Sequence, residues 1–239
     1  MSESASAGIL YLIPATISQE SVAWSLPENV LNIIRSLDVF IAENEKTARH
    51  FLKQCNITIP QQQLTIFELN KHAGNVFEQS FFEPLLNGKN TGLLSEAGCP
   101  AVADPGSLIV AEAHRQNIKV VPLTGPSSLL LALMASGLNG QQFAFGGYLP
   151  KDREERIAAL RKAEKESALK KQTQIFIETP YRNNALFEDM LAALSSQTKL
   201  CIAADLNSEN QYIKTCRISE WKKHKPNLNK RPAVWLFLA

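Results

Sequence analysis

The chain contains 239 residues, of which 45% are apolar and 20% are charged, and its formal net charge is +2. This composition is typical of a soluble globular protein of one or two domains that can bury a full core. No run approaches the roughly 20 apolar residues that a membrane-spanning helix needs, so we expect no membrane partner. The four cysteines follow neither C-x-x-C nor Cys/His metal-ligand spacing. This spacing argues against a zinc site and favours a reducing, cytoplasmic location.

Charge is distributed unevenly along the chain. Residues 1–122 carry 8 Lys and Arg against 12 Asp and Glu, whereas residues 123–239 carry 17 against 11. From Gln211 onward, seven basic residues stand against a single acid, Glu220. A basic C-terminal region of this kind could contact a polyanion such as RNA. On charge alone, an ordinary solvated surface is the simpler interpretation.

Short apolar runs alternate with segments of helical spacing, a pattern typical of α/β folds. The predicted strands are residues 8–13, 39–42, 64–69, 91–95, 118–123, 142–148, 174–178, 199–204, 212–217 and 233–238. Helices are predicted at residues 27–35, 43–50, 107–113, 126–135, 151–171 and 183–194. We expect two α/β domains, residues 1–122 and 123–239, and the first is predicted to be a doubly wound, mostly parallel sheet.

The first half of the chain offers few chemical signals. The loop after the first strand, Pro14 to Glu20, contains no glycine. Glu43 follows the second strand and, with Arg49, could lie at the mouth of a substrate site. Equally, the acids at this helix start could serve only to complement the helix dipole. We expect His72, after the third strand, to lie on the surface, because no second histidine or acid stands at metal-ligand spacing.

Two loops between residues 93 and 137 carry the strongest signal. Glu96 to Gly106 consists of small residues with two prolines and two glycines, a composition that lets a ligand lie close to the backbone. Thr124 to Ser128 forms the next tight turn. Both follow predicted strands, and open α/β sheets bind their ligands at the carboxyl ends of strands. The two turns are therefore expected to wall a shared site.

The helices that follow these loops have recognisable start signals. Ser107 is a reasonable N-cap for the helix after the first loop. Gly125 is the expected cap of the next helix, with Pro126 at its first position, where a missing N–H costs nothing. Because this second helix consists almost entirely of Leu and Ala, we expect it to be buried.

The ligand class follows from what the loops lack. Neither a G-x-G-x-x-G pattern nor a phosphate-binding glycine loop ending in Lys is present. The loops carry no Lys or Arg, so they suit a nucleoside without a phosphate tail. The N–H groups of Ser127 and Ser128 could hold one carboxylate at a helix N-terminus. S-adenosylmethionine has these features: an adenosine, one carboxylate and a sulfonium cation.

Four motifs occur in an order that resembles a known family. They are Ser95-Glu96-Ala97-Gly98-Cys99-Pro100 with Ala103-Asp104-Pro105-Gly106, then Pro122-Leu123-Thr124-Gly125-Pro126-Ser127-Ser128, then Gly147-Tyr148-Leu149-Pro150, and Glu178-Thr179-Pro180-Tyr181-Arg182. In this order they resemble the tetrapyrrole (corrin/porphyrin) methylase superfamily. Within it, the chain is similar to the small-subunit ribosomal RNA (cytidine-2′-O-)-methyltransferase I family.

The resemblance implies a methyltransferase that uses S-adenosylmethionine, modifies a ribose 2′-hydroxyl of ribosomal RNA and forms a homodimer. It also implies the two-domain architecture of class III methyltransferases, with a C-terminal mixed sheet and helices and a ligand cleft between the domains. No metal is implied. The loops and the matching motifs together predict cofactor contacts from Pro14, Glu96, Ala97, Gly98, Pro100, Ala101, Val102, Gly125, Pro126, Ser127, Ser128, Thr179, Ala204, Asp205, Pro232 and Ala233.

Asp104 and Glu178 are the candidate catalytic residues. A ribose hydroxyl must lose its proton during methyl transfer, and a carboxylate can accept it. Both residues also have a structural interpretation: Asp104 could cap the helix that follows it, and Glu178 could pair with Arg182. Two other functions stay open, a methylase of tetrapyrroles or other small molecules, and a non-catalytic protein that binds RNA or another partner.

Overall fold

The computed structural model describes residues 6–18, 22–69 and 78–239. The predicted surface position of His72 lies outside the described residues. The chain divides into two compact units, residues 1–127 and 128–239. This division falls shortly after the boundary predicted at residue 122, and the assignment of two independent domains stays a prediction. Among the described helices, none has both the length and the apolar character that crossing a membrane requires.

Unit 1 is built on a five-stranded sheet in which every pair of neighbouring strands is parallel. Its strands are β1 (Ile9–Ile13), β2 (Val39–Ala42), β3 (Thr65–Glu68), β4 (Thr91–Leu94) and β5 (Lys119–Pro122). Their order across the sheet is β3-β2-β4-β1-β5. Because β1 lies between β4 and β5, the loops that follow these three strands leave the sheet at the same edge.

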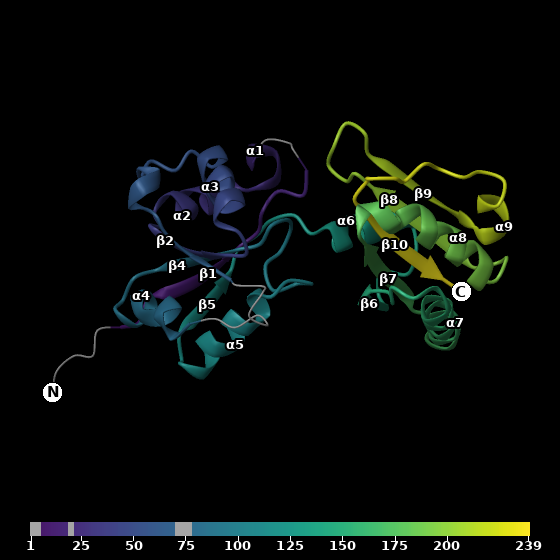
Figure 1. Ribbon diagram of the computed structural model, residues 1–239, viewed down its shortest axis with the longest axis horizontal. Helices are drawn as coiled ribbons and strands as arrows, with labels where there is room; N and C mark the ends of the chain where they lie inside the picture. Colours follow the sequence, from purple (N-terminus) through teal and green to yellow (C-terminus); the bar gives the residue numbers. More distant parts are fainter. Residues whose placement is uncertain (1–5, 19–21, 70–77) are drawn as a thin grey trace. The chain divides into compact units, whose positions relative to one another are not determined.

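Helices cover both faces of this sheet (Figure 1). They are α1 (Val22–Ser25), α2 (Glu28–Arg35), α3 (Glu45–Gln54), α4 (Glu83–Leu86) and α5 (Gly106–Arg115), with the 3-10 turns η1 (Gln61–Gln63) and η3 (Gln79–Phe82). Side chains alternate across a strand, so Phe40 of β2 packs with α2 and α3, while Ile41 packs with α4 and α5. The predicted doubly wound parallel sheet is therefore confirmed.

Unit 2 is built on a mixed five-stranded sheet. Its strands are β6 (Phe143–Tyr148), β7 (Thr173–Glu178), β8 (Lys199–Ala204), β9 (Tyr212–Arg217) and β10 (Ala233–Leu238). Their order is β6-β7-β10-β8-β9, in which β6 and β7 are parallel and the other neighbours are antiparallel. The expected C-terminal mixed sheet is confirmed.

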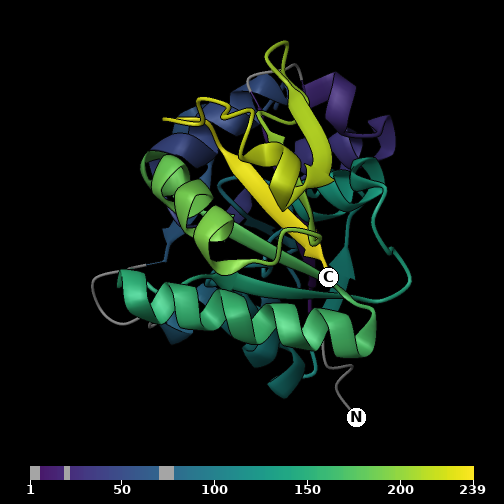
Figure 2. The same cartoon turned by 90° about the vertical axis from the view of Figure 1, so that its right-hand side faces the viewer.

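Helices pack on both faces of the second sheet as well. They are α6 (Ser128–Ser136), α7 (Arg153–Lys170), α8 (Asn183–Ala193) and α9 (Ile218–Trp221), with the 3-10 turn η4 (Pro180–Arg182). Trp235 of β10 belongs to the core with α7 and α8, which run alongside β10 in Figure 2. Thr215 and Leu236 lie on the other face, where the Thr215 hydroxyl donates to the Ser136 carbonyl oxygen of α6 at 2.7 Å.

Two predicted helix starts are wrong. α5 begins at Gly106 and is not capped by Ser107, because the Asp104 carboxylate already accepts the Gly106 N–H at 2.6 Å. α6 begins at Ser128, after the predicted Pro126, whose carbonyl oxygen is engaged by the loop that precedes α5. The first contact is local, within the loop after β4, and the second joins the loops after β4 and β5.

Helix α6 also differs from the buried helix that its Leu and Ala residues predict. Ala132 and Leu133 are buried, but Leu130 is 51% and Met134 is 79% exposed. One side of this apolar helix is therefore not covered within unit 2.

Candidate functional site

Three loops of unit 1 meet at the carboxyl ends of β1, β4 and β5. Ala15, after β1, exchanges backbone hydrogen bonds with Gly98, after β4, at 2.9 and 3.1 Å. The Cys99 thiol donates to the carbonyl oxygen of Pro126, after β5, at 3.5 Å. The two turns expected to wall a site are therefore neighbours in unit 1, as the strand order requires.

Gly98 and Gly125 are both required by the backbone. Gly98 has a φ of +74°, in the left-handed region that glycine adopts without a steric penalty. A Cβ on Gly125 would lie 2.5 Å from the Cβ of Pro14 and 3.0 Å from the Cδ2 of Leu26, so no side chain fits between the first and third loops. The predicted contacts Pro14 and Gly125 are therefore packed closely against each other, whereas Gly98 is determined by its left-handed backbone.

The predicted cofactor residues of unit 1 differ in accessibility. Glu96, Ala97 and Val102 are exposed, whereas Pro100 and Pro126 are buried. A ligand at these loops would therefore meet the side chains of the first three residues and, elsewhere, the backbone. The half-buried members of the set are Ala101, Ser127 and Ser128.

Asp104 holds the second loop in a strained conformation. Its Oδ1 accepts hydrogen bonds from the Ala101 N–H at 3.0 Å and from the Gly106 N–H at 2.6 Å. Ala101 and Ala103 have φ angles of +65° and +57°, which cost about 1 kcal/mol or more each for a residue with a Cβ. Such strain persists only where surrounding contacts enforce it, and the Asp104 carboxylate supplies two of them.

The second oxygen of Asp104 lies in a different environment. Oδ2 is buried and receives no hydrogen bond from an N–H or hydroxyl donor. Burial raises the pKa of Asp104 to about 6, against the opposing effect of the Gly106 and Ala101 amides, and a hydrogen bond with the Glu43 carboxyl group adds to the rise. The pKa of the Asp104 carboxyl group is thereby brought closer to neutral pH. Glu43, directly after β2, is half-buried, as is Asp104.

Arg49 is directed away from this pair. Its guanidinium binds the Glu45 carboxylate at 2.6 and 2.8 Å and the Gln61 carbonyl oxygen at 2.5 Å. Asn44 caps α3 by accepting the Thr47 N–H at 3.1 Å. Of the two side chains considered for a substrate mouth, only Glu43 lies beside the loop that follows β4.

In unit 2, Glu178 ends β7 and is fully engaged. Its Oε1 accepts the Thr179 N–H at 2.6 Å, and its Oε2 accepts an N–H from Arg182 at 2.6 Å. The Glu178 side chain is 1% exposed and that of Arg182 is 30% exposed. Both carboxylate oxygens already accept a hydrogen bond, and one of them is ion-paired with Arg182. The geometry favours the structural interpretation of Glu178.

The remaining predicted contacts of unit 2 lie at the same end of its sheet. Ala233 of β10 is paired with Ala204 of β8 on one side and with Glu178 of β7 on the other. The Asp205 N–H donates to the Pro232 carbonyl oxygen at 2.9 Å. Thr179 follows β7 directly, so it belongs to the same edge.

Asp205 is fixed in the same way as Glu178. Its Oδ2 accepts an N–H from Arg231 at 2.5 Å, and the Arg231 guanidinium lies 5.7 Å from the centre of the Tyr212 ring. The predicted residues thus form two groups, one in each unit. A cleft in which both groups face a single ligand stays a prediction. Among the described residues, no three His, Cys, Asp or Glu side chains are arranged to bind a metal ion.

The fold and these loops define a class of α/β enzyme with two successive sheets, the first parallel and the second mixed. The family Tetrapyrrole (Corrin/Porphyrin) Methylases matches residues 23–222. The chain belongs to this family, and it is therefore a member of a methyltransferase family.

Two relatives and one solved structure show which individual proteins the chain is similar to. The chain is 30% identical over 236 residues to ribosomal RNA small subunit methyltransferase I of Vibrio cholerae, covering 96% of this chain and 77% of the relative. It is 28% identical over 232 residues to the protein of the same name from Escherichia coli O157:H7, covering 96% and 77%. The crystal structure of uroporphyrin-III-C-methyltransferase from Thermus thermophilus covers 97% of this chain and 92% of its own, with a TM-score of 0.56 and 16% identity. This likeness supports the fold.

Sequence reasoning missed two features of the site. The backbone bridge between Ala15 and Gly98 leaves no signal in residue type, and the pairing of Glu43 with Asp104 joins residues that no shared motif connects. The order of strands in the sheet brings both pairs together. A strand-order prediction that placed β4 between β1 and β2 would have indicated the contact of Glu43 with the loop after β4.

Proposed function

We propose that this chain transfers a methyl group from S-adenosylmethionine to a ribose 2′-hydroxyl of ribosomal RNA. Similarity to proteins named ribosomal RNA small subunit methyltransferase I, which extends over nearly the whole chain, supports the RNA substrate. The single observation that carries the proposal is the wall without Lys or Arg in unit 1, at which Ala15, Gly98 and Gly125 bring three loops together.

The residues of this wall fit S-adenosylmethionine. When bound, this molecule supplies an electrophilic methyl group on a sulfonium cation. Residues 96–106 and 124–128 contain no Lys or Arg, so no like charge opposes the sulfonium. Exposed Ala97 and Val102 offer apolar surface to an adenosine. The N–H groups at the start of α6, at Ser128, can donate to a carboxylate.

The protein's main contributions to methyl transfer are alignment and exclusion of water. The hydroxyl proton also requires an acceptor, for which Asp104 and Glu178 are the predicted candidates. Both oxygens of Glu178 are occupied, and Asp104 Oδ2 is buried beside Glu43. We therefore assign proton acceptance to Asp104, which is half-buried and has the Glu43 carboxyl group beside it. Glu178 then serves to orient the segment that follows β7.

The oligomeric state and the cellular location are proposed from two other observations. The exposed side of α6, with Leu130 and Met134, supports contact with another protein surface, and we propose that this contact forms the homodimer. The scattered cysteines, all of them free thiols, support a cytoplasmic location.

Transfer of labelled methyl groups tests the proposal. Purified protein is incubated with labelled S-adenosylmethionine and unmodified small ribosomal subunits, with tetrapyrroles as the competing acceptor class. We expect label in ribosomal RNA, at a nucleoside whose 2′-oxygen carries the methyl group. Label in the tetrapyrrole alone, or label in neither acceptor although the cofactor binds, would contradict the proposed function.

A further inference from the structure

A cationic segment of unit 2 lies along helix α8 and reaches η4. The Lys225 ammonium contacts the Glu188 carboxylate at 2.8 and 3.0 Å, the Leu228 N–H donates to Asn184 Oδ1 at 2.9 Å, and the Lys230 N–H donates to the Pro180 carbonyl oxygen at 3.0 Å. Residues 225–230 therefore run antiparallel to α8, and residues 222–224, which are hydrogen-bonded to α9, precede them in the segment 222–230. We call this segment, together with η4, the lysine–tyrosine surface.

The segment is held in place although it has no helix or strand. Leu228 is fully buried in the core that contains Trp221, and the Asn229 N–H donates to Asn227 Oδ1 at 3.1 Å. Lys230 adopts a φ of +61°, which a residue with a Cβ keeps only where neighbouring contacts enforce it. The cations on this segment are therefore presented on a fixed backbone, and binding them costs little ordering entropy.

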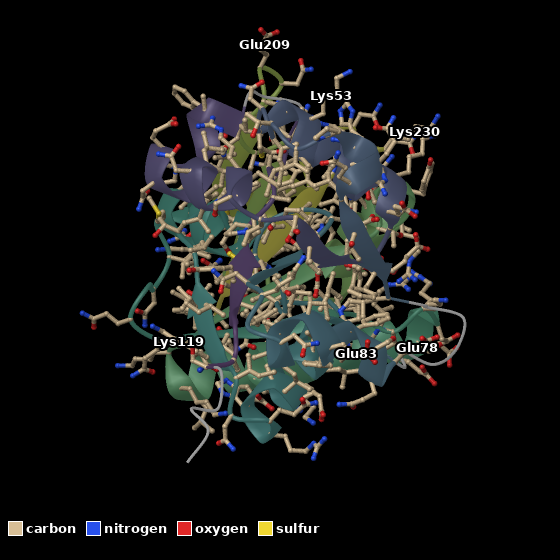
Figure 3. All side chains as sticks on the ribbon, turned by 90° about the vertical axis from the view of Figure 1, so that its left-hand side faces the viewer. Lys53, Glu78, Glu83, Lys119, Glu209 and Lys230 are labelled. Atoms are coloured by element: carbon tan, nitrogen blue, oxygen red, sulfur yellow. The ribbon has the colours of Figure 1, made fainter. Side chains whose placement is uncertain are left out.

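Most of these cations have no acidic partner. Lys222, Lys223 and Lys230 are exposed, and within the described part of the chain none of them forms an ion pair. Figure 3 shows the Lys230 side chain extending away from the ribbon. Lys225 is paired with Glu188, but both side chains are about half exposed, so the pair is weak and remains available.

Helix α7 shows what an ordinary solvated surface looks like in this protein. It interleaves its basic residues with acids, as in the pair between Lys170 and Glu166. Between residues 221 and 231, by contrast, the sequence contains five Lys and Arg residues and no acid. An unbalanced, fixed group of cations attracts a polyanion.

An exposed aromatic ring identifies the kind of polyanion. Tyr181 is 75% exposed and lies in η4, between Pro180, which accepts the Lys230 N–H, and Arg182, which is fixed by Glu178. Proteins hold unpaired bases by stacking them on exposed aromatic rings while cations contact the phosphates. A duplex hides its base faces in the stack, so a tyrosine presented in this way fits single-stranded RNA.

We propose that the lysine–tyrosine surface binds a single-stranded segment of the RNA substrate, with Tyr181 stacked on one base and Lys222, Lys223 and Lys230 against its phosphates. This inference rests on the proposed function, since it presumes that the substrate is RNA. It adds a binding surface outside the two groups of predicted cofactor residues.

The test compares RNA affinities of full-length variants by fluorescence anisotropy with a labelled single-stranded oligoribonucleotide and a hairpin duplex of the same composition. We expect Tyr181→Ala to weaken single-strand binding about tenfold or more and Tyr181→Trp to restore it. The Lys222→Ala/Lys223→Ala/Lys230→Ala variant should lower the slope of log Kd against log salt by about 2, for three lost phosphate contacts. The matched control, Lys162→Ala/Lys165→Ala/Lys170→Ala on α7, removes the same charge and should leave the slope nearly unchanged.

RNA binding by the lysine–tyrosine surface is excluded if the wild-type protein does not bind RNA, prefers the duplex, or binds anionic vesicles equally well. It is also excluded if the Tyr181 and lysine variants bind RNA as the α7 control does. The methyl-transfer assay tests the proposed function independently of RNA binding by the lysine–tyrosine surface. An unchanged KM for RNA in Tyr181→Ala would contradict RNA binding by the lysine–tyrosine surface but not the proposed methyl transfer. Tight, Tyr181-dependent RNA binding without turnover would contradict the proposed methyl transfer but not the RNA-binding surface.

Discussion

The carboxyl groups in the loops of unit 1 and those at the sheet edge of unit 2 have different kinds of partner. In unit 2, Glu178 and Asp205 each accept an N–H from an arginine, at 2.6 and 2.5 Å. In unit 1, Asp104 forms no ion pair with a Lys or Arg among the described residues, and its neighbour is a second carboxyl group, that of Glu43. Ion pairs thus fix the edge of unit 2, whereas backbone contacts shape the wall of unit 1. A wall without fixed cations suits a ligand that is itself a cation.

The largest expected effect comes from breaking an ion pair in unit 2. Arg182→Ala leaves the Glu178 carboxylate, which is 1% exposed, without its cation. We expect the free energy of unfolding to fall by about 3 kcal/mol, because a buried charge without a partner is costly. Urea denaturation measures the change. In the control Arg115→Ala the lost pair is at the surface, so the change should be much smaller, because solvent screens exposed ion pairs. Equal losses in the two variants would contradict the contrast between buried and surface pairs.

The second prediction disturbs the backbone contacts of unit 1. In Gly125→Ala, the new Cβ would lie 2.5 Å from the Cβ of Pro14, so the first and third loops must separate. We expect a loss of about 2 kcal/mol of stability and at least a tenfold weaker binding of S-adenosylmethionine. Gly140→Ala is the matched control, because a Cβ there meets nothing within 4 Å. Cofactor affinity that is the same in both variants would show that the close approach of Pro14 and Gly125 does not shape the site.

A smaller effect should follow from the uncompensated carboxyl of unit 1. Asp104 has its pKa raised from 3.8 to about 6 in the folded chain, so the protonated form is favoured by folding. Its stabilising contribution is complete below pH 4 and is lost as the pH rises through about 6. Because the group is partly exposed to solvent, the loss should be about 1 kcal/mol. Asp104→Asn keeps an acceptor for the Ala101 and Gly106 amides and can donate to Glu43, so it should abolish this loss.

Urea denaturation of wild type and Asp104→Asn at several values between pH 4 and pH 7 provides the measurement. The difference in unfolding free energy between the two proteins should change over this interval and be constant above it. A constant difference throughout would mean that the pKa of Asp104 is not raised in the folded chain.

The smallest expected effect on stability concerns α6. Met134 is 79% exposed, so Met134→Lys should change the unfolding free energy of the monomer by less than about 0.5 kcal/mol. If this side of α6 forms the proposed homodimer, the substitution buries a charge in the interface and should give a monomer in light scattering. A wild-type protein that is already monomeric, or an unchanged dimer in the variant, would exclude this interface.

Strand positions could be predicted well from the sequence. The bounds 39–42, 199–204, 212–217 and 233–238 agree with β2, β8, β9 and β10, because buried apolar runs end sharply at polar or turn-forming residues. The sequence also predicted that the loops after β4 and β5 lie next to each other, because open α/β sheets bind their ligands at the carboxyl ends of strands.

Features that depend on contacts between loops could not be predicted. Pro126 at the first helical position was a reasonable local assignment, but α6 begins at Ser128, and the Pro126 carbonyl oxygen accepts the Cys99 thiol of another loop. The contact of Asp104 with the Gly106 N–H is local, by contrast, and was an open alternative to the Ser107 cap. The exposure of Met134 likewise contradicts its apolar sequence context. Most importantly, the environment of Asp104 depends on Glu43, which the order of strands in the sheet, and not any local pattern, brings beside it.

Isothermal titration calorimetry of the intact chain with S-adenosylmethionine and S-adenosylhomocysteine tests the central claim most directly, namely that the loops of unit 1, which contain no Lys or Arg, hold a methyl donor. We predict one saturable site per chain for each ligand in wild type, unchanged in Gly140→Ala and weakened at least tenfold in Gly125→Ala. No heat of binding for either ligand to the folded wild-type protein would contradict the claim.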